Sequence, residues 1–151
     1  MVAQEAFEGA LEALAQKERT GAELAVWLRE RGFGSDDVEA AIGRLIEDGA
    51  IDDERFARRF AEDKRELRGW GPERIREALA ARGLDRALID AATADDDSQS
   101  QLERAIDLLE RRGQPPVDEA ARSRALAYLA RRGYDSDLAY EAVRGFERRA
   151  A

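Results

Sequence analysis

The sequence predicts an all-α fold made of three tandem three-helix repeats. A pentapeptide of the form Leu-x-x-Arg-Gly recurs with a regular period, ending at Gly32, Gly83 and Gly133. These glycines lie 51 and 50 residues apart, and a fixed period of this size is typical of repeat architectures. A fourth match, ending at Gly113, lies 20 residues before Gly133 and is expected to close the first helix of its repeat. Apolar residues also recur at helical spacing, and no segment alternates like a strand for long enough to count. We therefore expect repeats over residues 1–51, 52–94 and 95–151.

The recurring pentapeptide has the chemistry of a helix ending. A glycine just beyond the last helical turn adopts the left-handed conformation without a Cβ penalty. A large apolar residue follows each glycine (Phe33, Leu84 and Tyr134), where it can pack back on the last turn. The pentapeptide is thus interpreted chiefly as a structural stop that sets the period. If the pentapeptide has a role in function, we expect its arginines to carry that role, mostly Arg131 and Arg132.

The first repeat contains three predicted helices. The first carries apolar residues at helical spacing, namely Phe7, Ala10, Leu11 and Leu14. Thr20 and Glu23 have the spacing of a capping box, which starts the second helix. Ser35 or Asp36 is expected to cap the third helix.

The second repeat is predicted to open at Asp52 and Asp53. Its first helix places three apolar residues on one side: Phe56, Phe60 and Leu67. Gly69-Trp70-Gly71-Pro72 then breaks the chain, and proline suits the first position of the next helix. Asp85 is expected to cap a short third helix.

The third repeat follows a linker-like stretch at residues 94–100, in which Asp95, Asp96 and Asp97 are interpreted as linker. Ser98 with Gln101 is expected to form a capping box for a helix that ends at Gly113. Two further helices follow, and their apolar residues are Ala125, Leu129, Leu138, Val143 and Phe146.

Composition excludes several classes of chemistry. The chain of 151 residues has no Cys and no His, which removes thiolate catalysis and the commonest general base and metal ligand. No phosphate-cradling glycine loop or serine nucleophile elbow is present. We therefore expect no catalytic residue, no metal site and no cofactor, and hence no enzyme. No apolar run approaches the roughly 18 residues of a membrane span, so a cytoplasmic protein is expected.

Charge is unevenly distributed over the three repeats. The net charge is −8, with 5 basic and 11 acidic residues in the first repeat, 10 and 10 in the second, and 10 and 12 in the third. The third helices of the first and last repeats are acidic, through Asp36, Asp37, Glu39, Asp137 and Glu141 among others. Phosphates would repel such faces, so sequence-specific reading of a DNA major groove by these helices is not expected.

The most basic feature is the first helix of the second repeat and the segment after it. On a helical wheel Arg58, Arg65 and Arg68 point away from Phe56 and Phe60. Further arginines follow on the next helix: Arg74, Arg76 and Arg82. These residues form either a surface for an acidic protein or phosphate backbone, or a solvated face with i,i+4 ion pairs such as Glu54–Arg58. Runs of charged residues usually form solvent-exposed faces, which favours the solvated face with ion pairs over a binding surface. The same interpretation is favoured for Arg131-Arg132.

The remaining candidate residues have simpler explanations. The carboxylates of Asp52, Asp53 and Glu54 lack the spacing of a calcium loop, and helix capping accounts for them. Trp27 is predicted to lie in the core. Trp70, between two glycines, is equally compatible with a partially exposed contact residue, because aromatic side chains favour interfaces.

Taken together, these residues resemble the RecX family of regulatory proteins. Three ordered pieces carry the resemblance: Ala10-Leu11 with Thr20-x-x-Glu23-Leu24; Ile51-Asp52-Asp53-x-x-Phe56-Ala57-x-x-Phe60 with Gly71-x-x-Arg74-Ile75-x-x-x-Leu79-x-x-x-Gly83; and Arg124-x-x-x-Tyr128-Leu129-x-Arg131-Arg132-Gly133-Tyr134. The middle piece is the most specific. The chain departs from the family pattern at residues 16–21, where the family has Ser and more basic residues, which argues against DNA contact by the acidic first repeat.

The resemblance implies an elongated, curved molecule that is not an enzyme, and we expect a monomer. It implies binding along the RecA–DNA filament and restraint of the ATPase, strand-exchange and coprotease activities of RecA in DNA repair and the SOS response. Single- or double-stranded DNA without sequence preference is a further expected partner. The motif arginines Arg74, Arg131 and Arg132 are the preferred contacts within this candidate set: Arg58, Arg65, Arg68, Trp70, Arg74, Arg76, Arg82, Arg131 and Arg132. The alternatives are a direct DNA-binding protein and a helical-repeat scaffold for another acidic partner.

Overall fold

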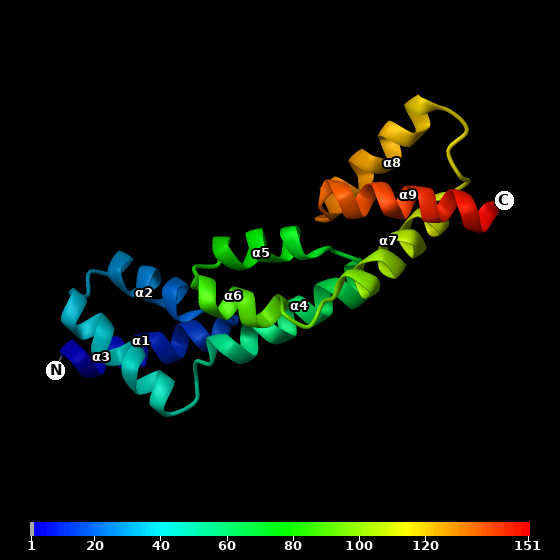
Figure 1. Cartoon of the computed structure of the whole chain (residues 1–151). Coiled ribbons are helices and arrows are strands. Elements are labelled where there is room, and N and C mark those ends of the chain that lie inside the picture. The colour runs from blue at the N-terminus through cyan, green and yellow to red at the C-terminus, as the bar shows by residue number, and fades with distance from the viewer. Residues whose placement is uncertain (1) are drawn as a thin grey trace. The chain divides into compact units, whose positions relative to one another are not determined.

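The computed structural model describes residues 2–151, and this part of the chain is helical throughout, without a strand (Figure 1). Its nine helices are α1 (Val2–Gln16), α2 (Gly21–Glu30), α3 (Ser35–Glu47), α4 (Asp53–Arg68), α5 (Pro72–Ala81), α6 (Arg86–Thr93), α7 (Ser98–Arg112), α8 (Glu119–Arg132) and α9 (Ser136–Ala150). The prediction of an all-α fold is confirmed. Pro72 is the first residue of α5 and Gly113 caps the end of α7, both as predicted.

Contacts between residues divide the chain into two compact units. Unit 1 comprises the chain up to Ala57 together with Leu79–Ile89, and unit 2 comprises Arg58–Ala78 together with Asp90–Ala151. The division falls inside α4, α5 and α6, so each of these helices contributes to both units. The predicted repeat boundaries follow the sequence period and stay a prediction.

Unit 1 has a core built from the apolar faces of α1, α2 and α3. Leu24, Leu28 and Leu45 are completely buried in it, and α1 packs along α3. Trp27, predicted to be a core residue, lies half-buried against this core, with the Arg31 guanidinium 3.3 Å from the centre of its ring. Full burial of a leucine side chain contributes about 1.5–3 kcal/mol relative to leaving it exposed.

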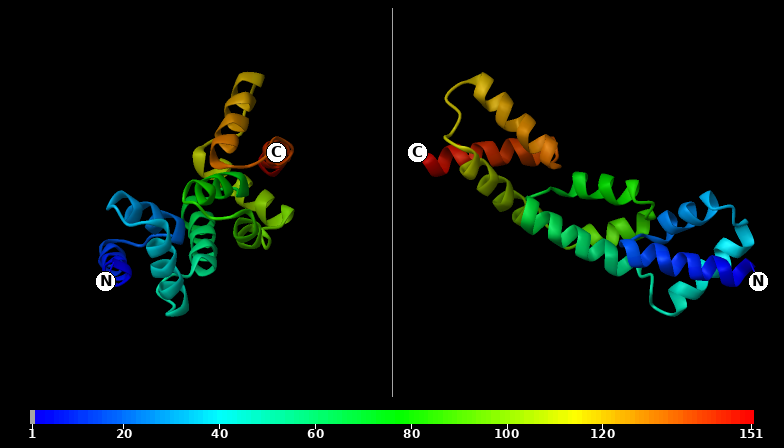
Figure 2. Two further views of the ribbon diagram at one scale, coloured as in Figure 1. Left: turned by 90° about the vertical axis from the view of Figure 1, so that its left-hand side faces the viewer. Right: turned by 180° about the vertical axis from the view of Figure 1, so that it is seen from behind.

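Unit 2 has a second core, between α7, α8 and α9. α7 and α9 lie side by side in every view of the molecule (Figure 2). Leu129 and Tyr134 are almost completely buried there, and Val143 and Phe146 pack from α9 as their spacing predicts.

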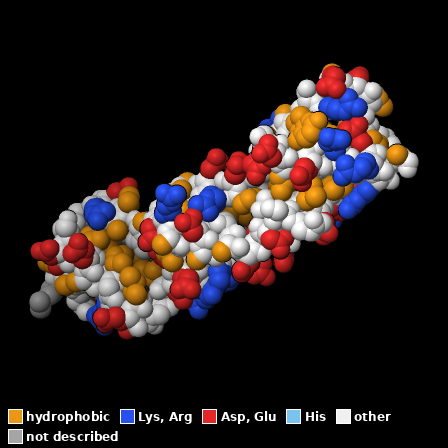
Figure 3. All heavy atoms as spheres, viewed as in Figure 1, with side chains coloured by type: hydrophobic (Ala, Val, Ile, Leu, Met, Phe, Trp, Pro, Cys, Tyr) orange, Lys and Arg blue, Asp and Glu red, His pale blue; other side chains and the backbone are white. Residues whose placement is uncertain are grey.

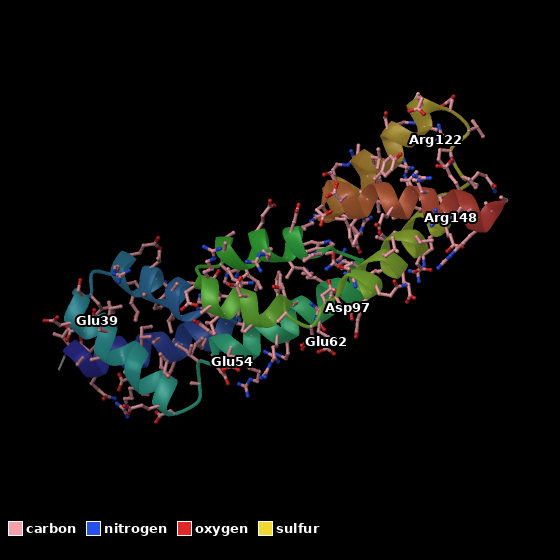
Figure 4. All side chains as sticks on the ribbon, in the orientation of Figure 1. Glu39, Glu54, Glu62, Asp97, Arg122 and Arg148 are labelled. Carbon is pink, nitrogen blue, oxygen red and sulfur yellow. The ribbon has the colours of Figure 1, made fainter. Side chains whose placement is uncertain are left out.

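Two predicted helix caps are wrong by one residue. Gly34, not Ser35 or Asp36, precedes α3, and no side chain caps that helix. Asp97, not Ser98, caps α7: its carboxylate accepts a hydrogen bond from the Ser100 N–H (2.8 Å), which lowers the pKa of Asp97 (Figure 4). Three consecutive aspartates offer several equivalent caps, and only the path of the preceding backbone selects one.

The buried side of α4 also differs from the predicted one. Leu67 is 78% exposed, although the helical wheel places it beside Phe56 and Phe60. The small residues Ala57 and Ala61 are both buried, and on a wheel of 100° per residue they lie at about 100° and 140° from Phe56. They extend the buried face toward Arg65, which lies at about 180° on the wheel. Arg65 is therefore half-buried and does not point away from the core as predicted. Leu67 lies in the last turn of α4 and stays exposed.

Candidate protein and nucleic-acid interface

The three recurring pentapeptides end their helices with the same hydrogen bonds. Gly32, Gly83 and Gly133 have φ angles of 91°, 83° and 101°, in the left-handed region. In each case the glycine N–H donates to the carbonyl three residues earlier, and the next N–H donates to the leucine carbonyl five residues earlier. This is the Schellman motif, which satisfies carbonyls that a helix end leaves free. The predicted structural stop is confirmed.

Within unit 1, the pentapeptide ending of α5 binds the start of α2. The Thr20 hydroxyl donates to the Arg82 carbonyl (2.7 Å), and Arg82 Nε and Nη2 donate to the Glu23 carboxylate (2.7 and 3.0 Å). Thr20 and Glu23 also form the predicted capping box of α2. One pair of residues thus caps a helix and holds the end of another. Arg82, a candidate contact residue, has a structural partner.

The ion pair between Glu23 and Arg82 gives the protein a defined pH dependence. Burial raises the pKa of Glu23, but hydrogen bonds from Arg82 and Thr20 and the charge of Arg82 outweigh it, so the pKa lies below its ordinary 4.5. A carboxylate with a depressed pKa stabilises the fold above its unfolded-state pKa, and this contribution disappears as the pH falls through the folded-state pKa.

We expect Glu23→Gln to destabilise the protein at pH 7 and to have a smaller effect at pH 3, because the stabilisation by the carboxylate is lost as the pH falls toward its depressed pKa. Urea unfolding of both proteins at the two pH values measures the difference. The exposed Glu30, also on α2, provides the control Glu30→Gln, for which a small, pH-independent change is expected. A Glu23→Gln effect that is the same at pH 3 and pH 7 would contradict the assignment.

Within unit 2, the pentapeptide ending of α8 binds the start of α5. The Gly71 N–H donates to the Arg132 carbonyl (2.7 Å) and the Glu73 N–H donates to the Gly133 carbonyl (3.0 Å). Free N–H groups at one helix start therefore meet free carbonyls at another helix end, a pairing that the helix dipoles also favour. The backbones of the two helix ends approach so closely that positions 71 and 133 must both be glycine.

Three candidate contact residues have their side chains in this junction. Arg74 Nη1 donates to the Arg131 carbonyl (3.1 Å), and Arg132 Nη1 donates to the Arg68 carbonyl (2.9 Å). Trp70 is half-buried, with the Arg74 guanidinium 4.1 Å from its ring centre and the Lys64 ammonium at 4.9 Å. Stacked cations of this kind hold an aromatic ring in place.

A buried polar network, missed by the sequence analysis, supports the same junction. Arg104 Nη1 and Nη2 donate to both carboxylate oxygens of Asp96 (3.1 and 2.7 Å), and Arg104 Nε donates to the Tyr134 hydroxyl (2.8 Å). That hydroxyl donates in turn to the Gly69 carbonyl (2.7 Å). The side chain of Asp96 is only 2% exposed, so the interpretation of this residue as linker is wrong.

The network fixes the protonation of its members. Burial opposes the charge of Arg104, but the hydrogen bonds and charge of Asp96 and Tyr134 outweigh it and raise the pKa of Arg104. Burial raises the pKa of the Tyr134 hydroxyl, and the neighbouring Arg104 only partly offsets this effect. The guanidinium therefore stays charged and the phenol stays neutral over the physiological pH range.

A hollow of about 710 Å³ opens beside this network in unit 2. Arginines line it from α4, α7 and α8, together with carboxylates: Arg65, Arg68, Arg104, Arg111 and Arg132, and Glu66, Asp95, Asp96 and Asp107. Asp96 is paired with Arg104, and Asp107 with Arg111 (2.8 Å). Arg65 Nη1 is buried at its wall with no hydrogen-bond partner among the described residues. The structure therefore brings Arg65, Arg68 and Arg132 together around one concavity.

The other candidate arginines have different surroundings. Arg76 donates to the Thr93 hydroxyl (2.9 Å) and pairs with Asp90. Arg58 is exposed on α4, but it already interacts with another residue of the protein and is not a free side chain. Arg68 and Arg131 are exposed, and within residues 2–151 their side chains make no hydrogen bond or ion pair.

Two of the three candidate carboxylates, Asp52 and Asp53, serve as helix caps. Asp52 accepts from the Arg55 N–H (3.0 Å) at the start of α4, and Asp53 accepts from the Gly21 N–H (3.1 Å) at the start of α2. Across the described residues, no group of three or more Asp, Glu, His or Cys side chains could hold a metal ion. None of the described helices is long and apolar enough to span a membrane.

These helices and their junctions define an all-α protein of tandem three-helix domains. The models of the first, second and third three-helix domains of RecX match residues 6–45, 52–92 and 99–143. Proteins called regulatory protein RecX from Pseudomonas syringae pv. tomato and Pseudomonas fluorescens are 37% and 38% identical over 131 and 133 residues, which cover 85% of this chain and 83% of each relative. The chain belongs to the RecX family of regulatory proteins.

Solved structures agree on the fold. The crystal structure of RecX from Lactobacillus salivarius superposes with a TM-score of 0.86, at 20% identity and over 97% of both chains. A second crystal structure of a regulatory protein RecX gives a TM-score of 0.78 at 23% identity, over 95% of this chain and 72% of that one.

Proposed function

We propose that this protein regulates the RecA recombinase by binding the RecA–DNA filament, and that it restrains the ATPase, strand-exchange and coprotease activities of RecA without catalysis of its own. Membership of the RecX family and the resemblance of the motif arginines support the partner. The polar groups of the junctions cap helices and form ion pairs. These structural roles fit a protein that acts by binding.

One observation carries the choice of contact residues. Arg68 and Arg131 are exposed and unpaired within the described chain, whereas Arg74, Arg76, Arg82 and Arg132 have intramolecular partners. The two side chains stand at the ends of α4 and α8, which the hydrogen bond from Arg132 to the Arg68 carbonyl joins. A free guanidinium can bind a carboxylate or phosphate with two parallel hydrogen bonds. Arg68 and Arg131 are therefore the proposed primary contacts.

The anchored arginines then have a supporting role. Arg74 and Arg132 hold the helix ends from which Arg131 and Arg68 project, so their loss would displace both contacts. Arg65 lies in the wall of the same hollow as Arg68 and supplies additional positive charge near the same anionic group. Rigid positioning of this kind lowers the entropy that binding costs.

Charge reversal of the two free arginines is expected to abolish most filament binding. The double variant Arg68→Glu/Arg131→Glu should bind RecA filaments on single-stranded DNA about tenfold to a hundredfold more weakly than wild type, because it replaces two attractions by repulsions. Co-sedimentation with preformed filaments measures the affinity. The matched control Arg29→Glu/Arg55→Glu changes the net charge equally on exposed residues of unit 1 and should bind like wild type.

Equal weakening by both double variants would contradict the assigned contacts. The same assay without RecA separates a second candidate function, direct DNA binding, which the arginine-lined hollow favours. Binding to bare single-stranded DNA whose affinity falls with salt, with a slope of about −0.7 per phosphate contact, would support that function instead.

A further inference from the structure

A groove of about 750 Å³ lies in unit 2 between α8, the start of α9 and Glu73 of α5. Its lining is largely apolar: Leu126, Ala127, Ala130, Tyr134, Ala139 and Tyr140. Tyr140 is 55% exposed, although it is a large aromatic side chain in the middle of a helix. In Figure 3, hydrophobic side chains gather over α8, and acidic side chains lie beside them near the start of α9.

The rim of this groove is acidic. Glu73, Asp135 and Asp137 line it, and no Lys or Arg does among the described residues. Asp135 also caps α9, since its carboxylate accepts from the Leu138 N–H (2.8 Å). The carboxylates of Glu73 and Asp137 make no hydrogen bond or ion pair with any described residue. In a chain where most arginines have partners, this patch of negative charge is uncompensated.

The apolar floor continues past Tyr140 along α8 and α9. A second hollow of about 360 Å³ shares Leu126 and Tyr140 with the groove. Three of its four charged side chains pair with one another, since Arg122 of α8, labelled in Figure 4, binds Glu119 (2.6 Å) and Glu147 (3.0 Å). The fourth, Arg144, lies over the ring of Tyr140, 5.7 Å from its centre, so the charges of this hollow balance. The apolar surface therefore has an acidic end, at the rim of the groove, and an end whose charges balance. A bound segment would be oriented by this difference in charge.

We propose that this groove binds a basic amphipathic segment of a partner protein. An apolar side chain of the segment would lie against Leu126 and Tyr140, and Lys or Arg beside it would pair with Glu73 and Asp137. Charge complementarity selects this occupant, because the uncompensated carboxylates repel the phosphates of a nucleic acid and the acidic groups that Arg68 and Arg131 attract. The groove is thus a second surface, lined by residues other than the proposed arginine contacts and opposite to them in sign.

The test uses the full-length ¹⁵N-labelled chain and a synthetic helical peptide of Leu and Lys, with a Leu and Glu peptide of the same pattern as the negative probe. The Lys peptide is expected to shift the amide signals of Ala127, Ala130, Ser136 and Tyr140 saturably, and the Glu peptide to shift none. Glu73→Lys/Asp137→Lys should weaken binding about tenfold, and Tyr140→Ser should weaken it by a similar factor without a change of charge.

A matched variant separates the groove from the general negative charge of the protein. Glu39→Lys/Glu47→Lys makes the same charge change on exposed residues of α3 in unit 1, and it should leave the affinity for the Lys peptide unchanged. Equal weakening by the two charge variants would overturn the proposal. So would shifts spread over the acidic residues of both units, or the absence of saturable binding.

Discussion

Gly133→Ala is expected to destabilise the protein by about 3–5 kcal/mol, the sum of a left-handed conformational cost and a steric clash in a packed junction. Gly133 has a φ of 101°, and an added Cβ would overlap the Cβ of Arg74 and lie 2.6 Å from the backbone nitrogen of Arg74. Neither neighbour can move without breaking the hydrogen bond between the Glu73 N–H and the Gly133 carbonyl. The junction between α8 and α5 must therefore open.

The same substitution at Gly32 provides the control. Gly32 ends α2 with the same Schellman motif and a φ of 91°, but nothing lies within 4 Å of an added Cβ. Gly32→Ala should cost only the conformational term, about 1–2 kcal/mol. Urea unfolding followed by the fluorescence of Trp70 in a Trp27→Phe background reports on unit 2, and the converse background reports on unit 1. Equal losses at the two positions would show that the pentapeptide is a helix stop only.

Asp96→Ala is expected to destabilise the protein by about 2–4 kcal/mol, because it leaves the half-buried Arg104 charge without its bidentate partner. Arg104 is 18% exposed in its side chain and borders the hollow, so water offsets part of the loss. The Tyr134 hydroxyl retains its bond to the Gly69 carbonyl. The melting temperature and the urea midpoint of the variant measure the effect.

A double-mutant cycle tests whether Asp96 and Arg104 act as a pair. Asp96→Ala/Arg104→Met removes both charges and replaces the guanidinium by an apolar side chain, so it should be more stable than the sum of the two single effects predicts. Additive losses would contradict the pairing. The exposed Asp95 serves as the control, since Asp95→Ala is expected to change stability by less than about 0.5 kcal/mol.

Local features of this fold could be predicted from the sequence because short segments determine them. The capping box at Thr20, the proline start of α5 and the glycine endings all depend on residues within about five positions of each other. The buried face of α4 was harder to predict, because its bulky apolar residues indicate one side of the helix whereas the small residues Ala57 and Ala61 extend the buried face to another side. The pairing of Asp96 with Arg104 gives no signal in the sequence, since an acidic run has the composition of a linker.

The candidate site was predictable in its residue type but not in its division of roles. Arg82 and Arg132 occupy the same place in the pentapeptide, yet one binds the Glu23 carboxylate and the other binds the Arg68 carbonyl. Arg31, the third member, lies over Trp27. Which arginines remain available for a partner depends on contacts between residues about 60 positions apart in the chain. The choice of Arg68 alongside Arg131 as contacts therefore requires the structure.

The single-stranded-DNA-dependent ATPase of RecA, measured while this protein is titrated in, tests the central claim most directly. Wild-type protein should lower the rate in a saturable manner, and Arg29→Glu/Arg55→Glu should do the same at equal concentrations. Arg68→Glu/Arg131→Glu should need about tenfold to a hundredfold more protein for the same effect. An ATPase rate that is unchanged at saturating wild-type protein would contradict the proposal that this protein regulates RecA.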